Sequence, residues 1–139
     1  MRFWVGLCVL LAFAGCRGPK GSPDSSVKSF FSAAGAQDYA SMAETVARST
    51  ITRMGSQARA EAFLAEEFAG WSSVDVSIAD WSVAADEKHA TVTFNCVAQT
   101  LRNYKPVKLD CSDTYPLVRE DDGKWHIELP GTHGLRVIQ

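Results

Sequence analysis

Apolar residues recur with helical spacing through the first half of the chain. Val27 and Phe30 begin a run whose apolar side chains lie three or four residues apart, and Gly35 ends it. Similar runs follow Asp38 and Ser56, two residue types that cap helix N-termini. The pattern predicts three helices, with these apolar faces: Val27, Phe30, Phe31 and Ala34; Tyr39, Met42, Ala43 and Val46; Ala60, Phe63, Leu64 and Phe68.

After Gly70 the apolar period falls to two residues, which is typical of strands with one buried face. The apolar alternation changes phase at Ala79–Asp80, which predicts a bulge in this strand. Earlier in the chain, the secondary structure of residues 48–55 is ambiguous from the pattern. The predicted strands carry these alternating residues: Val74, Val76, Ile78, Trp81 and Val83; Val92, Phe94, Cys96 and Ala98; Val107, Leu109, Cys111, Asp113, Tyr115 and Leu117; Trp125, Ile127 and Leu129. We therefore expect an α+β fold, with N-terminal helices packed on a curved antiparallel sheet of about four strands.

The N-terminal residues have the pattern of a targeting segment. Arg2 precedes an apolar run over residues 3–14, and small residues lead to Cys16. The run is shorter than the roughly 20 residues of a membrane-spanning helix, and Gly, Pro and Ser are frequent after it. We expect three parts: a signal peptide over 1–15, a flexible tether over 16–25 and a single domain over 26–139.

Ala14-Gly15-Cys16 resembles the bacterial lipoprotein cleavage box, although Phe13 stands where the family prefers an aliphatic residue. The resemblance implies cleavage before Cys16 and attachment of a diacylglyceryl group to its sulfur, with palmitate-type acyl chains. Two or more acyl chains hold a protein stably on a bilayer. We therefore expect a lipid-anchored protein of the cell envelope that faces the periplasm or the cell surface. The alternative is an ordinary secretory signal that is cut nearby.

Composition and charge exclude several classes of protein. Apolar residues make up 46% of the 139 residues and charged residues 22%, which fits one globular domain. Lys and Arg number 14 against 16 Asp and Glu, so no basic field is available for nucleic acid. The sequence has no Walker loop, G-x-G-x-x-G, G-x-S-x-G, H-E-x-x-H or C-x-x-C, and we expect neither a cofactor nor a metal.

Two segments of the domain carry a resemblance to a known superfamily. The first is residues 26–31, followed by Asp38-Tyr39, and the second is residues 115–127, with an acidic-Gly-Lys-Trp hairpin. Over residues 24–130 the chain resembles the nuclear transport factor 2-like superfamily, and in particular its small bacterial lipoproteins of unknown function. The superfamily includes isomerases, dehydratases, hydrolases and non-catalytic binding or dimerising domains, so the resemblance implies the fold and the possibility of a homodimer.

Cys96 and Cys111 form a candidate disulfide. Each lies on the apolar parity of its strand, and a turn at Asn103-Tyr104 places them seven residues to either side of it, directly opposite one another. Export permits a disulfide. A loop of odd length would shift this register and leave two free thiols instead.

The candidate catalytic residues are inferred only from the face of the strand or helix on which they lie. Asp113 shares the apolar parity of its strand, so as a pocket carboxylate it could act as a general base. Tyr39, on the apolar face of its helix, could donate a hydrogen bond to an oxyanion. The alternative places Asp113 at the rim of the sheet and Tyr39 in ordinary packing. We interpret His89, His126 and His133 as surface residues.

Aromatic residues are numerous enough to line a cavity for a small apolar ligand, or simply to form the core. The candidates for such a pocket are Phe31, Tyr39, Trp71, Phe94 and Tyr115. The favoured hypothesis is a non-catalytic envelope lipoprotein, bound to the membrane through Cys16, whose domain binds an envelope protein or a small apolar ligand. The alternative is an isomerase- or dehydratase-type enzyme that uses Asp113 and Tyr39.

Overall fold

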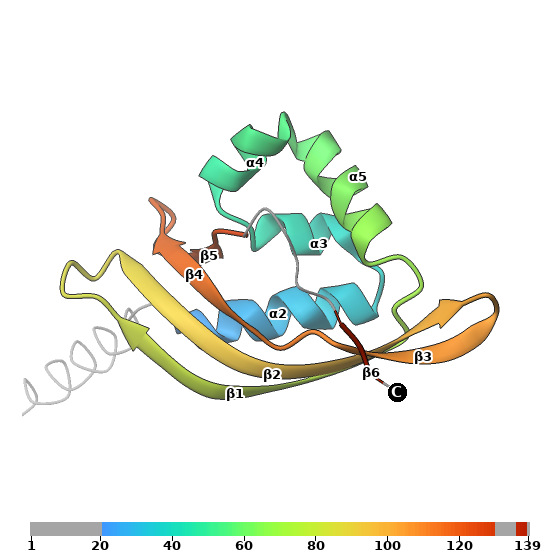
Figure 1. Ribbon diagram of the computed structural model, residues 1–139. Coiled ribbons are helices and arrows are strands. Elements are labelled where there is room, and N and C mark those ends of the chain that lie inside the picture. The colour runs from blue at the N-terminus through green and yellow to red at the C-terminus, as the bar shows by residue number, and fades with distance from the viewer. Residues whose placement is uncertain (1–20, 130–135, 139) are drawn as a thin grey trace, which may run out of the picture.

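The computed structural model describes residues 21–129 and 136–138, and within them the helices precede the strands (Figure 1). The predicted signal peptide, Cys16 and His133 lie outside the described residues. The helices are α2 (Pro23–Gly35), α3 (Tyr39–Glu44), α4 (Arg48–Met54) and α5 (Gln57–Glu67). The strands are β1 (Ser73–Val83), β2 (His89–Arg102), β3 (Lys105–Asp110), β4 (Asp113–Arg119), β5 (Trp125–Ile127) and β6 (Arg136–Ile138).

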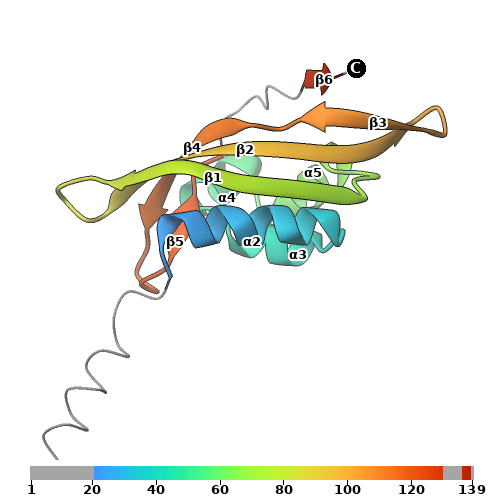
Figure 2. The same cartoon turned by 90° about the horizontal axis from the view of Figure 1, so that it is seen from below.

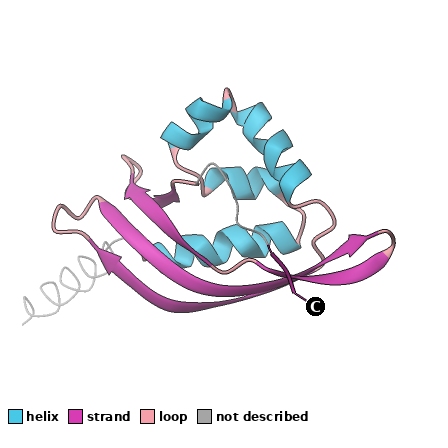
Figure 3. Cartoon of the chain, in the orientation of Figure 1, coloured by secondary structure: helices cyan, strands magenta, loops and turns pink. Residues whose placement is uncertain are grey.

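The centre of the sheet is β2. One edge of β2 pairs with β1, and the other edge is shared by β4, beside residues 89–94, and β3, beside residues 97–102. The short strands β5 and β6 extend the sheet beyond β4 and β3, and all these pairs are antiparallel. The helices lie on the concave side of the curved sheet, with α2 along it (Figures 2 and 3). The predicted α+β fold is confirmed; β5 is the predicted fourth strand, and β6 is a short addition.

The helix boundaries follow the predicted caps. Asp38 and Ser56 each accept a backbone N–H three residues on, at 3.2 Å, and so begin α3 and α5. The ambiguous stretch that begins at Arg48 forms α4. Helix α2 begins earlier than predicted, at Pro23, because the fixed φ of proline suits the first helical turn. The last three residues of the predicted tether, 16–25, therefore belong to a helix.

The third predicted strand is two strands in the structure. β3 ends at Asp110 and β4 begins at Asp113, since Ser112 interrupts the ladder with its side chain. The Cys96 N–H donates to Ser112 Oγ at 2.9 Å. The register against β2 is the same on both sides of the break, so the inward-facing residues keep one parity. The predicted bulge in β1 is confirmed between Ile78 and Asp80.

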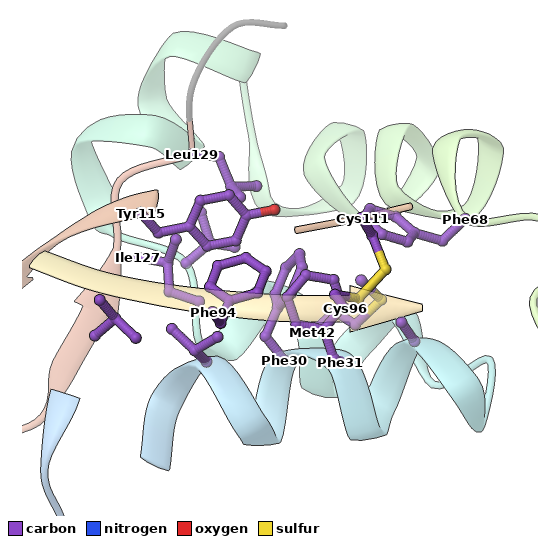
Figure 4. Close-up of a cluster of buried hydrophobic side chains, with 14 of the residues drawn as sticks. Phe30, Phe31, Met42, Phe68, Phe94, Cys96, Cys111, Tyr115, Ile127 and Leu129 are labelled. Atoms are coloured by element: carbon purple, nitrogen blue, oxygen red, sulfur yellow. A yellow bond between two sulfur atoms is a disulfide. The ribbon is translucent and has the colours of Figure 1, made fainter. Parts of the chain in front are cut away.

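The core lies between the concave face and the helices (Figure 4). Phe30 and Phe31 from α2 meet Phe94 from β2 and Tyr115 from β4, and each is at most 2% exposed. Burial of such large apolar side chains supplies the main driving force for packing the helices on the sheet. Within residues 21–129 and 136–138, no helix has both the length and the apolarity needed to cross a membrane.

Candidate functional site

Aromatic rings fill the concave interior where the sequence suggested a ligand pocket. Phe31 lies at the centre, with ring centroids 5.2 Å from Phe94, 6.1 Å from Tyr115 and 6.4 Å from Trp71. Phe94 and Tyr115 are themselves 4.9 Å apart. These distances are those of packed aromatic pairs. The four residues are therefore core, and the interpretation of them as the lining of a ligand cavity is wrong.

The candidate catalytic residues Asp113 and Tyr39 lie at the starts of two different elements. Asp113 is half-buried at the start of β4, and its Oδ1 accepts the backbone N–H of Thr114 at 2.7 Å. Tyr39 is half-buried at the start of α3, which packs against α2 and α5, and its side chain packs against the core. Five cavities among the described residues are lined by neither side chain.

Tyr115 is the buried titratable group next to Asp113. Burial raises the pKa of the Tyr115 phenol far above its ordinary value, and the charge of the Asp113 carboxylate raises this pKa further. The phenol is therefore neutral at physiological pH. It serves as a packed ring of the core, in contact with Phe30 and Phe31.

The predicted disulfide is present between Cys96 and Cys111. Their Cα atoms are 4.8 Å apart, and the Cys111 N–H donates to the Cys96 carbonyl at 2.9 Å. The hairpin turns at Asn103-Tyr104 as expected, since Arg102 pairs with Lys105. The bond lies directly beside the break at Ser112, where it ties β2 to the segment that joins β3 to β4 (Figure 4).

The structure shows a polar cluster at His126, which the sequence analysis interpreted as a surface residue. His126 is 8% exposed, and its Nε2–H donates to Asp122 Oδ2 at 2.8 Å, with Glu120 Oε1 3.4 Å away. Glu120 also accepts the backbone N–H of Arg48 at 2.8 Å, so the cluster joins α4 to the β4–β5 turn. Within the described residues, His126 Nδ1 is buried without a hydrogen-bond partner.

The parity argument failed at His126 because segments distant in sequence cover β5. Ser26 Oγ donates to the Trp125 carbonyl at 2.7 Å. Along the same edge of β5, the Ile127 N–H donates to the Thr45 carbonyl and the Ile127 carbonyl accepts the N–H of Ala47, both at 2.8 Å. All three residues of β5 are buried. A carboxylate four residues before the histidine, in a turn, is a sequence signal that could have indicated its partner.

Two cavities flank His126. The first, of about 350 Å³, lies between the N-terminus of α2, α3 and β5, and hydroxyl groups are frequent in its lining. The second, of about 340 Å³, lies between α4 and the β4–β5 turn and includes both carboxylates of the cluster. The backbone N–H of Lys124 holds the pKa of Asp122 below its usual range, and the hydrogen bond from His126 lowers this pKa further. In the part of the chain that the structure describes, no three His, Cys, Asp or Glu side chains are arranged to hold a metal ion.

The fold places the protein in a known structural class. A helical layer on one strongly curved antiparallel sheet is the nuclear transport factor 2-like fold, which ketosteroid isomerase-like proteins share. A ketosteroid isomerase-like protein from Erwinia carotovora atroseptica SCRI1043 matches with a TM-score of 0.57 at 11% sequence identity, over 76% of this chain and 87% of that one. The fold predicted by resemblance is thereby confirmed.

A second solved structure has the same fold. The epoxide hydrolase/cyclase-like enzyme SalBIII, described by its role in pyran ring formation in the polyether salinomycin, matches with a TM-score of 0.53 at 12% identity. The match covers 84% of this chain and 95% of that enzyme. At such low identity the likeness concerns the fold alone. No protein-family model and no curated protein sequence matches the chain.

Proposed function

We propose that the protein is a membrane-anchored lipoprotein of the bacterial envelope whose domain binds a partner without catalysing a reaction. The filled interior carries the non-catalytic part of this proposal. Phe31, Trp71, Phe94 and Tyr115 occupy the space beneath the curved sheet with mutual ring contacts. A partner therefore binds at the outer surface.

The proposal of a lipid anchor is supported by Cys16 and the small residues before it. Gly21 and Pro23 bring the chain into the domain at one end of the sheet, beside Trp81 and Trp125. An anchor at Cys16 holds this end of the domain close to the bilayer, because only a few residues separate Cys16 from α2.

Intact mass spectrometry of the protein purified from a bacterial membrane tests the anchor. We expect the mass of residues 16–139 plus acyl groups, and a rise of two hydrogen atoms when the Cys96–Cys111 disulfide is reduced. A Cys16→Ala variant serves as the control, and it loses both the acyl groups and the membrane fraction. An unacylated wild-type protein in the soluble fraction contradicts the proposal.

Ligand-dependent stability tests the non-catalytic role. Ligand at 100 times its Kd raises the free energy of unfolding by about 2.7 kcal/mol. We expect small apolar ketones and epoxides to leave the wild-type melting temperature unchanged, because the interior is occupied by side chains. A saturable rise that is lost in Asp113→Asn or Tyr39→Phe supports the enzyme alternative instead.

A further inference from the structure

The end of the β2–β3 hairpin extends past the helical layer (Figure 2). Its final pairs are Leu101 with Pro106 and Arg102 with Lys105, closed by the turn at Asn103-Tyr104. We call residues 101–108 the hairpin tip. Leu101 is 60% exposed and Tyr104 is 99% exposed, so the hairpin tip presents apolar and aromatic surface to solvent.

Tyr104 has an unfavourable backbone conformation. Its φ is 63° and that of Asn103 is 50°, the left-handed conformations of a tight hairpin turn. The second position of such a turn favours glycine, and an L-residue there costs about 1 kcal/mol. Since the side chain is almost wholly exposed, the packing of this chain does not account for a tyrosine at this cost.

The hairpin tip is also cationic. Arg102, Lys105 and Lys108 are exposed, and residues 99–109 contain neither Asp nor Glu. Within the described residues no carboxylate lies within 4 Å of these three cations. The hairpin tip therefore combines an aromatic residue with exposed positive charge, which fits an apolar surface edged by carboxylates.

Such a surface lies at the opposite end of the same molecule. Here Trp81 and Val83 are 44% and 39% exposed, because β1 continues beyond the helices. They border a cavity of about 430 Å³, which we call the end groove. Its lining includes Pro23, Trp81, Val83, Glu87, Arg119 and Trp125.

The end groove lies beside two acidic turns. The β1–β2 turn at 84–88 and the β4–β5 turn at 120–124 together hold five carboxylates and two lysines. The two turns adjoin, because the Arg119 N–H donates to the Lys88 carbonyl at 2.8 Å. Glu87 and Arg119 line the end groove itself, so an aromatic side chain entering there meets one carboxylate and one guanidinium at the rim, and the excess of negative charge comes from the two turns.

A hairpin tip cannot enter the end groove of its own molecule. β2 connects the two ends, and its 14 residues span about 46 Å at 3.3 Å per residue. We propose that the hairpin tip of one copy docks into the end groove of a second copy, with Tyr104 against Trp81 and Val83, and Lys105 facing Glu87. The contact joins two different surfaces, so it can repeat from copy to copy along a row. This self-association goes beyond the proposed function and does not require the anchor.

Cross-linking in cells tests the contact on the full chain. Ser22→Cys places a thiol on the end groove, and Pro106→Cys places one on the hairpin tip, while Tyr104, Lys105 and Glu87 stay intact. Ser22 makes no side-chain cap bond, its hydrogen bond with Ser25 Oγ at 3.1 Å is exposed, and Pro106 is exposed, so both substitutions are mild. A short bifunctional maleimide is expected to give a ladder of dimers, trimers and larger species.

Matched variants decide the outcome. A chain with Arg59→Cys in place of Ser22→Cys is the control, since Arg59 is exposed on α5. Tyr104→Ser, Lys105→Glu and Glu87→Lys should each reduce the ladder about tenfold, and Lys105→Glu with Glu87→Lys should restore it. A ladder no stronger than the control, a product that stops at dimers, or a ladder that the single variants leave unchanged would overturn the proposal. The fraction that holds the ladder, membrane or soluble, reports on the anchor separately.

Discussion

At the scale of single residues, the turn at Asn103-Tyr104 contains a residue type that is not the most stable one for its backbone conformation. Hairpin turns of two residues favour Asn-Gly because both positions have positive φ. Asn103 fits the first position, while Tyr104 at φ 63° is a strained second residue. The strain lies in an exposed turn, away from the core, and therefore lowers stability without disturbing the fold.

Tyr104→Gly should stabilise the isolated domain. The substitution removes the left-handed strain of an L-residue, so we expect the free energy of unfolding to rise by about 1 kcal/mol in urea titrations. Tyr104→Ala retains the strain and should give no gain. A loss of stability in Tyr104→Gly would mean that the tyrosine ring packs within its own molecule.

Single residues also show how far parity arguments reach. The pairing of Cys96 with Cys111 could be predicted because Asn103 fixed the turn, and the turn fixed the register of the strands beside it. Asp113 kept the predicted parity, yet it lies half-buried at a strand end, where its carboxylate accepts the backbone N–H of Thr114. His126 broke the parity rule, since all three residues of β5 are buried. Coverage of a short strand depends on distant segments and does not show in its own sequence.

At the scale of elements, hydrogen bonds to the Asp122 carboxylate stabilise the β4–β5 turn. Asp122 accepts the backbone N–H of Lys124 at 2.9 Å and the His126 Nε2–H at 2.8 Å. Both bonds favour its ionised form, and the pKa of Asp122 is lowered. A lowered pKa in the folded state means that the stabilisation is complete above the unfolded pKa, about 3.9, and is lost as pH falls through the folded value.

Asp122→Asn should reduce the loss of stability that acid pH causes. Wild type binds a proton at Asp122 more weakly when folded than when unfolded, so its stability declines below pH 4. The variant lacks this linkage and should lose less stability between pH 5 and pH 2.5 in thermal melts. Glu61→Gln, on the surface of α5 and outside the cluster, is the control. Parallel curves for Asp122→Asn and wild type would contradict the prediction.

The disulfide joins β2 to the segment where β3 gives way to β4. The two cysteines are 15 residues apart in sequence, and closing a loop of that size stabilises a fold by about 3 kcal/mol in the loop-entropy model. The break at Ser112 could not be predicted, because a serine side chain that replaces one ladder hydrogen bond leaves the apolar alternation unchanged. The bond therefore secures the sheet where its backbone pairing is interrupted.

Removal of the disulfide should cost about 3 kcal/mol. Reduction of wild type by dithiothreitol is expected to lower the free energy of unfolding by that amount, measured in urea. Cys96→Ala with Cys111→Ala should begin at the lower value and show no response to the reductant. A reductant effect in the double variant, or none in wild type, would show that the bond is not what stabilises this part of the sheet.

At the scale of the whole molecule, helix α2 fills the concave side of a strongly curved sheet. Phe30 and Phe31 of α2 meet the rings of β2 and β4, so the largest buried aromatic side chains of the described residues share one cluster. The fold followed from the order of the helices and strands along the sequence. Whether the interior holds a ligand or side chains depends on how aromatic rings from different elements pack together. The alternation of apolar and polar residues along the sequence does not determine that packing.

Phe31→Ala should be strongly destabilising. Phe31 is 1% exposed and packs against five other rings of the described residues, so truncation leaves a large cavity. We expect a loss of about 3–5 kcal/mol in the free energy of unfolding. Ser32→Ala, at the exposed neighbouring position, should stay within about 0.5 kcal/mol of wild type. A small loss in Phe31→Ala would mean that the interior is looser than its ring contacts indicate.

The hydrogen bond from Ser26 to the Trp125 carbonyl joins residues that are 99 positions apart. The hairpins of the sheet form between neighbours in sequence, so they can pair as soon as the chain emerges, whereas α2 meets β5 only after nearly the whole chain is available. The first helix of the described residues thus completes its packing only when the last part of the domain is available. For a chain that crosses a membrane unfolded, as the proposed signal peptide implies, α2 can therefore complete its packing only after Trp125 has crossed.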